Sequence, residues 1–112
     1  MAQKNIKLPP QDLEAEYSVL GALMVEKNAI IKIADSLTPA DFYHPSNQKI
    51  YEVNLELFEQ NKPIDLLTVS NRLKEKKVLK ETGGVDYLTD LINSVPTSAH
   101  IAHYANIVNE KR

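Results

Sequence analysis

The sequence of 112 residues predicts an all-α fold, a compact bundle of about six helices. Apolar residues recur at helical spacing in successive segments, and no segment alternates apolar and polar residues with the period of two that is typical of a strand. Prolines, glycines and short polar clusters separate these segments. With 43% hydrophobic residues, a chain of this length can bury the core of one domain. We expect a flexible arm over residues 1–8, a helical globule over 9–98 and a final helix over 99–112.

The first helix is expected over residues 12–26. Pro10 has the fixed φ that suits a first helical turn, and acidic side chains follow it at the positive end of the helix dipole. Gly21 lies inside this helix, although glycine there costs about 1 kcal/mol relative to alanine. Because glycine has no side chain, this position predicts a second helix that crosses close to the backbone. The apolar face of the first helix consists of Leu13, Tyr17, Leu20 and Met24.

A second helix is expected over residues 29–37. The segment TPADFY, residues 38–43, then has the pattern of a helix start, with threonine as the cap, proline at the first position and aspartate three residues after the cap. Because HPSN follows at once, this start predicts a single turn that buries Phe42 and Tyr43.

Two further helices follow, each with a polar residue that can cap it. Ser46 can cap a helix over residues 47–60, and Asp65 can cap a helix over residues 66–77. The buried face of the first of these helices is expected to contain Ile50, Tyr51, Leu55 and Phe58.

A short helix is expected over residues 85–93, and Ser98 can cap the final helix over 99–112. The final helix has no glycine or proline near its end, so we expect it to continue in a longer protein. Val108 would then lack an apolar partner, because only NEKR follows it. We expect this part of the helix to be exposed and to support a weak monomer–dimer equilibrium. The candidate self-association surface consists of Ile101, Tyr104 and Val108.

The composition excludes several classes of protein. A net charge of −2 argues against a general binder of nucleic acid or of anionic membranes. The absence of cysteine excludes disulfides and thiolate chemistry. No signal-peptide pattern and no run of transmembrane length occurs, so we expect a cytoplasmic protein with no membrane partner.

The polar residues offer no recognisable catalytic or metal site. His100 and His103 share a helix face, but zinc needs more protein ligands than these two, so we interpret them as surface residues. Glu52, Glu56 and Glu59 line one face of a helix, which indicates either a solvated face or a docking surface for a basic partner. The TGG turn lacks the lysine of a phosphate-binding loop. We therefore expect no catalytic, cofactor-binding or metal-binding residue in this chain.

The segment RLKEKKVLK carries the strongest signal for nucleic acid. Its basic residues lie at the end of the expected helix over 66–77 and precede a glycine turn, an order that also occurs in winged-helix DNA-binding modules. The other interpretation is a solvated helix end whose charges suit the helix dipole. Binding to DNA would then be weak and independent of sequence. The candidate surface for nucleic acid or a partner consists of Arg72, Lys74, Lys76, Lys77 and Lys80.

Five motifs occur in the order and spacing of one known family. They are PPQDLEAEYSVLGALM, DFY, KPIDLLTVSNRL, GGVDYLTDL and VPTSAHIAHYANIVNEK. Together they make the chain resemble the N-terminal domain of the bacterial replicative DNA helicase, the DnaB family, from Pro9 to Arg112. Two positions depart from the family pattern: Tyr17 stands where glutamine is usual, and Asn47 where histidine usually follows DFY. Each is interpreted as a helix-surface or packing position.

The resemblance implies a role that these residues alone do not reveal. Such a helicase is a homohexameric ring that unwinds duplex DNA at the replication fork, and its ATP and magnesium are bound by a RecA-like motor domain that is absent from this chain. The N-terminal domains form a collar, a trimer of dimers, on which the C-terminal domain of primase docks. A helicase loader is a further candidate partner. By this comparison residues 99–112 enter the first arm of a helical hairpin, here truncated.

Two competing functions stay open at this stage. One is a winged-helix DNA-binding module that uses residues 72–80, and the other is an unrelated helical adaptor. A motif of the form G-x-x-x-x-G-K-[ST] further along the gene would decide for the helicase. In each case we expect the chain itself to be no enzyme, and the isolated domain to neither bind nor hydrolyse ATP.

Overall fold

A computed structural model describes residues 10–95 and 101–110 of the chain, with side chains from Leu13 onward. All regular structure in these ranges is helical, which confirms the predicted all-α class, but the described helices are five α-helices and two short 3₁₀ helices. The predicted arm over residues 1–8 and the predicted cap Ser98 lie outside the described residues. The helices are α1 (Pro10–Val25), η1 (Ala29–Lys32), η2 (Pro39–Asp41), α2 (Pro45–Glu59), α3 (Leu66–Glu75), α4 (Gly84–Asn93) and α5 (Ile101–Glu110).

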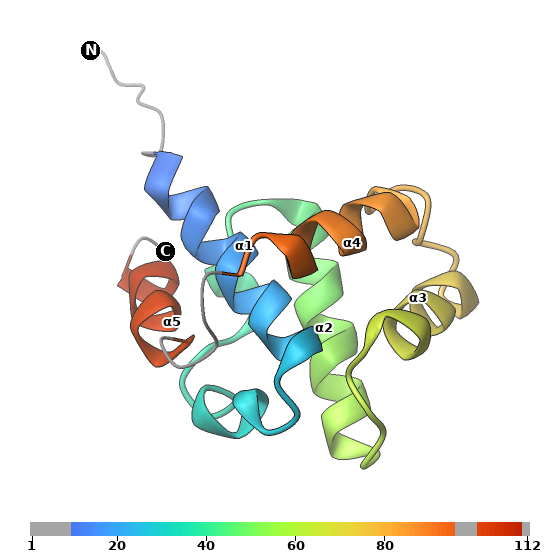
Figure 1. Cartoon of the computed structure of the whole chain (residues 1–112), viewed down its shortest axis with the longest axis horizontal. Coiled ribbons are helices and arrows are strands. Elements are labelled where there is room, and N and C mark those ends of the chain that lie inside the picture. The colour runs from blue at the N-terminus through green and yellow to red at the C-terminus, as the bar shows by residue number, and fades with distance from the viewer. Residues whose placement is uncertain (1–9, 96–100, 111–112) are drawn as a thin grey trace.

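The first helix is the centre of the fold. Figure 1 shows α1 running through the middle of the molecule, with α5 on one side and α4 on the other. Helix α2 packs against both α1 and α3, and α3 also contacts α4. Because α1 has neighbours on several sides, its buried residues extend over more than one face, as its broad apolar pattern indicates. The buried apolar residues are Ala15, Val19, Leu20, Ala22, Leu23 and Met24.

The segment after α1 differs from the predicted helix over residues 29–37. Only residues 29–32 are regular, as the 3₁₀ helix η1, and single turns follow to Leu37. The hydrogen bonds here are of both the 3₁₀ and the α type. The Ile33 N–H donates to the Ile30 carbonyl, three residues back, and the Ala34 N–H donates to the same oxygen, four residues back. A segment this short gains little from helix propagation, so packing decides its winding. Its buried residues are Ala29, Ile30, Ile33 and Leu37.

The predicted start signals have mixed outcomes. The Thr38 N–H donates to the Asp41 carboxylate at 2.8 Å, which confirms the capping box of η2. Phe42 is buried as predicted, but Tyr43 is 64% exposed, so its predicted burial was wrong. Phe42, which ends the turn, has an extended backbone, and successive side chains along an extended backbone point to opposite sides. Tyr43 is therefore exposed where Phe42 is buried.

The predicted caps of the next two helices also have mixed outcomes: the cap predicted for α2 was wrong, and the cap predicted for α3 is confirmed. Helix α2 begins at Pro45, one position before the predicted cap Ser46, and its cap is His44, whose Nδ1 accepts a hydrogen bond from the Ser46 N–H at 3.1 Å. A proline suits this first position because its missing N–H would have no helical partner. Asp65 caps α3 as predicted, since its carboxylate accepts from the Thr68 N–H at 2.8 Å.

The buried face of α2 is rotated relative to the predicted one. Ile50 and Tyr51 are buried as predicted, and Leu55 is half-buried against the core, but Phe58 is 37% exposed, so its predicted place in the core was wrong. Helix α2 packs on both α1 and α3, and these neighbours cover the side that carries Val53, Asn54 and Leu57. The side chain of Asn54 is therefore enclosed, although none of its polar atoms has a hydrogen-bond partner among the described residues.

Candidate interaction surfaces

Helix α4 passes directly over Gly21. A Cβ atom at Gly21 would lie 2.1 Å from the carbonyl oxygen of Leu91 and 2.4 Å from Cγ2 of Val95. Atoms cannot approach this closely without a shift of the backbone, so only glycine allows the crossing. The glycine that interrupts the first helix thereby sets the distance between α1 and the end of α4.

The expected self-association surface on the last helix was wrong in two of its three residues. Ile101 and Val108 are 0% and 2% exposed, so neither can contact another chain. Helix α5 packs against α1 and η1, and this places Val108 in the core of its own chain. The sequence did not reveal this partner because it lies far away along the chain. Tyr104, the third residue, is half-buried.

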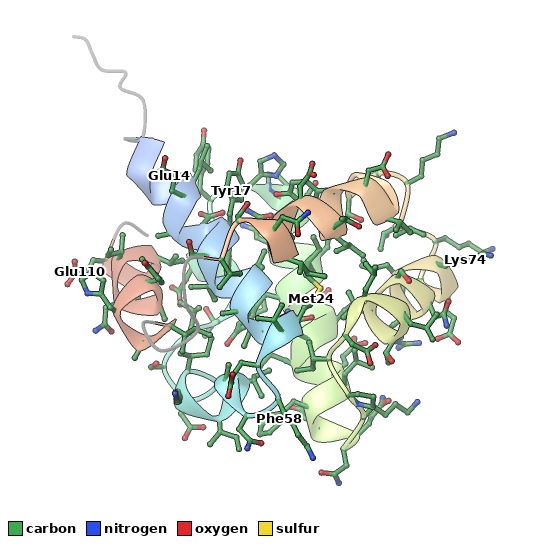
Figure 2. All side chains as sticks on the ribbon, viewed as in Figure 1. Glu14, Tyr17, Met24, Phe58, Lys74 and Glu110 are labelled. Atoms are coloured by element: carbon green, nitrogen blue, oxygen red, sulfur yellow. The ribbon has the colours of Figure 1, made fainter. Side chains whose placement is uncertain are left out.

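Tyr104 lies at a groove between α1 and α5. The groove has a volume of about 590 Å³, and Tyr17 and Ile107 contribute further apolar surface to it. Figure 2 shows Tyr17 on the side of α1 that faces α4, where its ring lies edge-on to that of Tyr87, with the ring centroids 6.3 Å apart. The described residues that line the groove are Glu14, Ala15, Tyr17, Ser18, Ser94, Tyr104 and Ile107.

The basic residues at and beyond the end of α3 do not form one surface, contrary to what their spacing predicts. Arg72 and Lys76 turn toward α2, where the Glu56 carboxylate lies 3.0 Å from the Arg72 Nε and 2.7 Å from the Lys76 Nζ. Glu52 adds a longer contact to Lys76, at 3.8 Å, and Glu75 lies 3.2 Å from the Arg72 guanidinium. Glu52 and Glu56 on α2 are therefore ion-pair partners of α3, although Glu52 stays exposed, and Glu59 is exposed as well.

These ion pairs change the proton affinity of the glutamate at their centre. The hydrogen bond from Lys76, with a smaller contribution from Arg72, lowers the pKa of Glu56 below its ordinary value of 4.5, against the opposing effect of burial. The positive charges of Arg72 and Lys76 are thus already balanced within the chain. They offer little to a nucleic acid.

Three lysines of the same stretch stay at the surface. Lys74, Lys77 and Lys80 line a second groove of about 480 Å³ between the end of α3 and the start of α4. Leu79 and Gly84 complete its described lining. Figure 2 shows Lys74 at the outer edge of the molecule, beside α3.

A winged helix is not formed in this region. The residues between α3 and α4 make turns, and α4 begins at Gly84, where a wing would need two strands. The buried side of α3 consists of Val69, Ser70 and Leu73 and packs against α2 and α4. The alternative of a winged-helix DNA-binding module is therefore wrong for this chain.

A buried polar cluster connects α1 to the start of α2 and to α4, and it was not predicted from the sequence. The Glu16 carboxylate is 2% exposed and accepts hydrogen bonds from the Tyr43 N–H at 2.6 Å and from the Asn47 amide at 2.7 Å. The Tyr87 hydroxyl donates to the Asn47 carbonyl oxygen, while burial and the nearby Tyr17 and Glu16 raise the pKa of Tyr87. Asn47 is thus an interior hydrogen-bonding residue and not a surface position.

The signal for this cluster was present in the sequence. Glu16 follows Leu13 by three residues and precedes Leu20 by four, which puts it on the apolar stripe of its helix. A carboxylate on such a stripe is buried only with hydrogen-bond donors around it, so its position predicts a structural role.

Two negative findings concern the described part of the chain. Within residues 10–95 and 101–110, no three histidine, cysteine or acidic side chains come together as a metal site would require. In the same ranges, no helix combines the length and the apolar character needed to cross a membrane. His103 lies on the exposed side of α5, and the predicted neighbour His100 lies outside the described residues.

Comparison with known proteins gives one consistent result. The chain is 49% identical over 107 residues to the replicative DNA helicase DnaC of Bacillus subtilis, and 42% identical over 105 residues to the replicative DNA helicase DnaB of Geobacillus stearothermophilus. These matches cover 96% and 94% of this chain but only 24% and 23% of the helicases. The chain therefore spans about a quarter of the length of these relatives.

A solved structure has the same fold. The crystal structure of the N-terminal domain of DnaB helicase from Mycobacterium tuberculosis superimposes with a TM-score of 0.88 at 44% sequence identity. The match covers 93% of this chain and 75% of that one. The profile of the family described as DnaB-like helicase N terminal domain matches residues 8–110. Since this profile extends over nearly the whole sequence, the chain belongs to the family of DnaB-like helicase N-terminal domains.

Proposed function

We propose that this chain is the N-terminal assembly and primase-docking domain of a bacterial replicative DNA helicase. The full-length hexamer would unwind duplex DNA at the replication fork in the cytoplasm. The observation that supports this proposal most directly is the match of nearly the whole chain to DnaB-like helicase N-terminal domains, in sequence and in fold, and to about a quarter of the length of a replicative helicase. In this role the chain contributes surfaces for self-assembly and for partners.

The chemistry of unwinding would belong to the rest of the helicase. ATP and magnesium would bind to a RecA-like motor domain outside these 112 residues, and a phosphate-binding loop in that domain would hold the nucleotide. The purified chain should therefore give no ATPase activity above that of a buffer control, and no change in the fluorescence of a labelled ATP analogue. Turnover that survives repeated purification would contradict the division of labour proposed for the domain.

Self-assembly would use the groove between α1 and α5. The groove presents apolar side chains of Tyr17, Tyr104 and Ile107 at the surface, which is the kind of patch that a second identical chain can cover. Sedimentation of the chain at rising concentration should reveal a weak monomer–dimer equilibrium, and Tyr104→Ser should shift it toward the monomer. Tyr43→Ser is the matched control, because Tyr43 is an exposed tyrosine outside this groove.

Primase docking is tested by direct titration. We expect saturable binding when the C-terminal domain of primase from the same bacterium is titrated into the chain, with an affinity in the range of transient complexes. A helicase loader is the second partner to titrate. If neither protein binds to the chain or to the full-length helicase, the domain serves assembly alone.

A further inference from the structure

We propose that the groove between α3 and α4 binds a short acidic segment of a partner protein that carries an apolar anchor residue. The groove is the volume of about 480 Å³ lined by Lys74, Lys77, Lys80, Leu79 and Gly84. This inference rests on the groove alone, and it holds whether or not the chain docks primase.

The three lysines supply uncompensated positive charge. In the described part of the chain, every ion pair of the basic stretch involves Arg72 or Lys76, whereas Lys74, Lys77 and Lys80 have no carboxylate within 4.0 Å. All three are exposed, so their ammonium groups keep their hydration and can exchange it for a carboxylate of a ligand. Charges of one sign around a groove raise the local concentration of ligands of the opposite sign.

The groove is not purely polar. Leu79 is half-buried and gives it an apolar wall, and the space beside Gly84 is open, since a Cβ atom placed there would meet no atom within 4 Å. An inorganic anion would leave this apolar surface uncovered. A peptide with an apolar side chain between acidic residues would cover the wall and meet the lysines at the same time.

The backbone of Lys77 adds an independent observation. Lys77 has a φ of 64° and occupies the position after the end of α3 where the left-handed conformation normally selects glycine. The hydrogen bonds are those of that ending: the Val78 N–H donates to the Leu73 carbonyl, and the Lys77 N–H donates to the Lys74 carbonyl. A lysine in this conformation costs about 1 kcal/mol relative to glycine. This cost is explained if the Lys77 ammonium group contributes to ligand binding in the groove.

The surroundings favour a short acidic peptide over a nucleic acid. Glu75, Glu81 and Asp86 are exposed next to the lysines, and the chain as a whole has a net charge of −2. A nucleic acid strand carries evenly spaced phosphates beyond the reach of three lysines, so its flanking charges would meet these carboxylates. A segment of a few residues can place its acidic groups within the groove and end there.

The proposal is tested with a labelled peptide and the 112-residue chain. We expect the peptide DELFED to bind with a dissociation constant on the order of 10–100 µM at low salt, and to weaken as salt rises. Two control peptides separate the contributions: NQLFQN lacks the charges, and DESSED lacks the apolar anchor. Both should bind at least about threefold more weakly, since each loses one of the two kinds of contact.

Variants of the chain locate the binding site. Lys77→Gly should weaken the peptide two- to fivefold, about the effect of one exposed charge, and should raise the melting temperature at the same time. A purely structural role of Lys77 would not produce opposite changes in binding and stability. Combined Lys74→Glu and Lys80→Glu should weaken binding about tenfold or more, whereas Lys32→Glu, an exposed lysine on η1, should have little effect.

Three outcomes would overturn the proposal. An equal response to Lys32→Glu would mean that the peptide senses only the net charge of the chain. Equal affinity for DELFED and DESSED would remove the apolar anchor. Tighter binding of a short oligothymidylate, lost in the same lysine variants, would assign the groove to nucleic acid.

Discussion

At the scale of single residues, Gly21 and Gly84 are required for different physical reasons. Gly21 is required by space, because the Leu91 carbonyl occupies the volume of a Cβ atom, whereas Gly84 is required only by its backbone, with a φ of 73° and open space beside it. Gly21→Ala should lower the free energy of unfolding by about 3 kcal/mol or more, since the backbone of α4 must move. Gly84→Ala should cost about 1 kcal/mol of strain. Urea denaturation measures both values.

The difference in cost between Gly21→Ala and Gly84→Ala tests whether the crossing of α4 over α1 is fixed. If Gly21→Ala cost no more than Gly84→Ala, α4 would be free to move away from α1, and the crossing would not be a fixed feature of the fold. A small cost at both positions would mean that the last turn of α4 adapts without loss.

A second residue-scale prediction concerns the buried carboxylate. Glu16 accepts hydrogen bonds from two backbone N–H groups and one amide, so a charged acceptor matches its surroundings. Glu16→Gln keeps the shape but turns an N–H donor toward other donors. We expect a loss of about 2–3 kcal/mol of stability. Glu14→Gln, an exposed glutamate on the same helix, is the control and should stay within about 0.5 kcal/mol of the original chain. Similar losses in both variants would point to the helix dipole instead.

At the scale of elements, the contact between α2 and α3 depends on ionised Glu56. Its pKa is lowered in the folded chain, so its contribution to stability is fully present above the unfolded value of about 4.5 and is lost as the pH falls below it. Glu56→Gln should reduce stability at neutral pH by about 1 kcal/mol. The difference between the variant and the original chain should then shrink on acidification.

Thermal melts as a function of pH test this contact between helices. Glu59→Gln changes an exposed glutamate near the end of the same helix and should leave the acid response unchanged. A Glu56→Gln variant whose stability runs parallel to that of the original chain at every pH would mean that the ion pairs contribute nothing measurable.

The helices also show which structural features can be predicted from local sequence patterns. Two local signals succeeded: the capping box at Thr38 and Asp41 and the cap at Asp65 depend on residues within one turn, and the structure has both. A third was displaced by two residues, since His44 and not Ser46 caps α2. The predicted winding of residues 29–37 and the predicted burial of Phe58 on α2 were wrong, since both depend on which distant helix lies against the segment. The same limit applies to Arg72 and Lys76, whose partner Glu56 lies on another helix.

At the scale of the whole molecule, α5 is part of the single core and not an appendage. Ile101, Ala105 and Val108 are buried among residues of the preceding helices, although they follow those helices by many positions in the sequence. No local pattern could distinguish a stripe that packs on its own chain from one that packs on another copy. The apolar stripe of α5 packs on its own chain because α1 and η1 together form the surface that it covers.

The last prediction follows from this shared core. Val108→Glu places a carboxylate in a site that is 2% exposed, so it should lower the free energy of unfolding of the entire chain by about 3 kcal/mol or more. Tyr104→Glu, on the half-buried side of the same helix, should cost less stability than Val108→Glu and act on self-association. Circular dichroism melts and sedimentation, measured on both variants, separate the two effects. A Val108→Glu chain that melts like the original would mean that α5 detaches without cost, and the core would then end with α4.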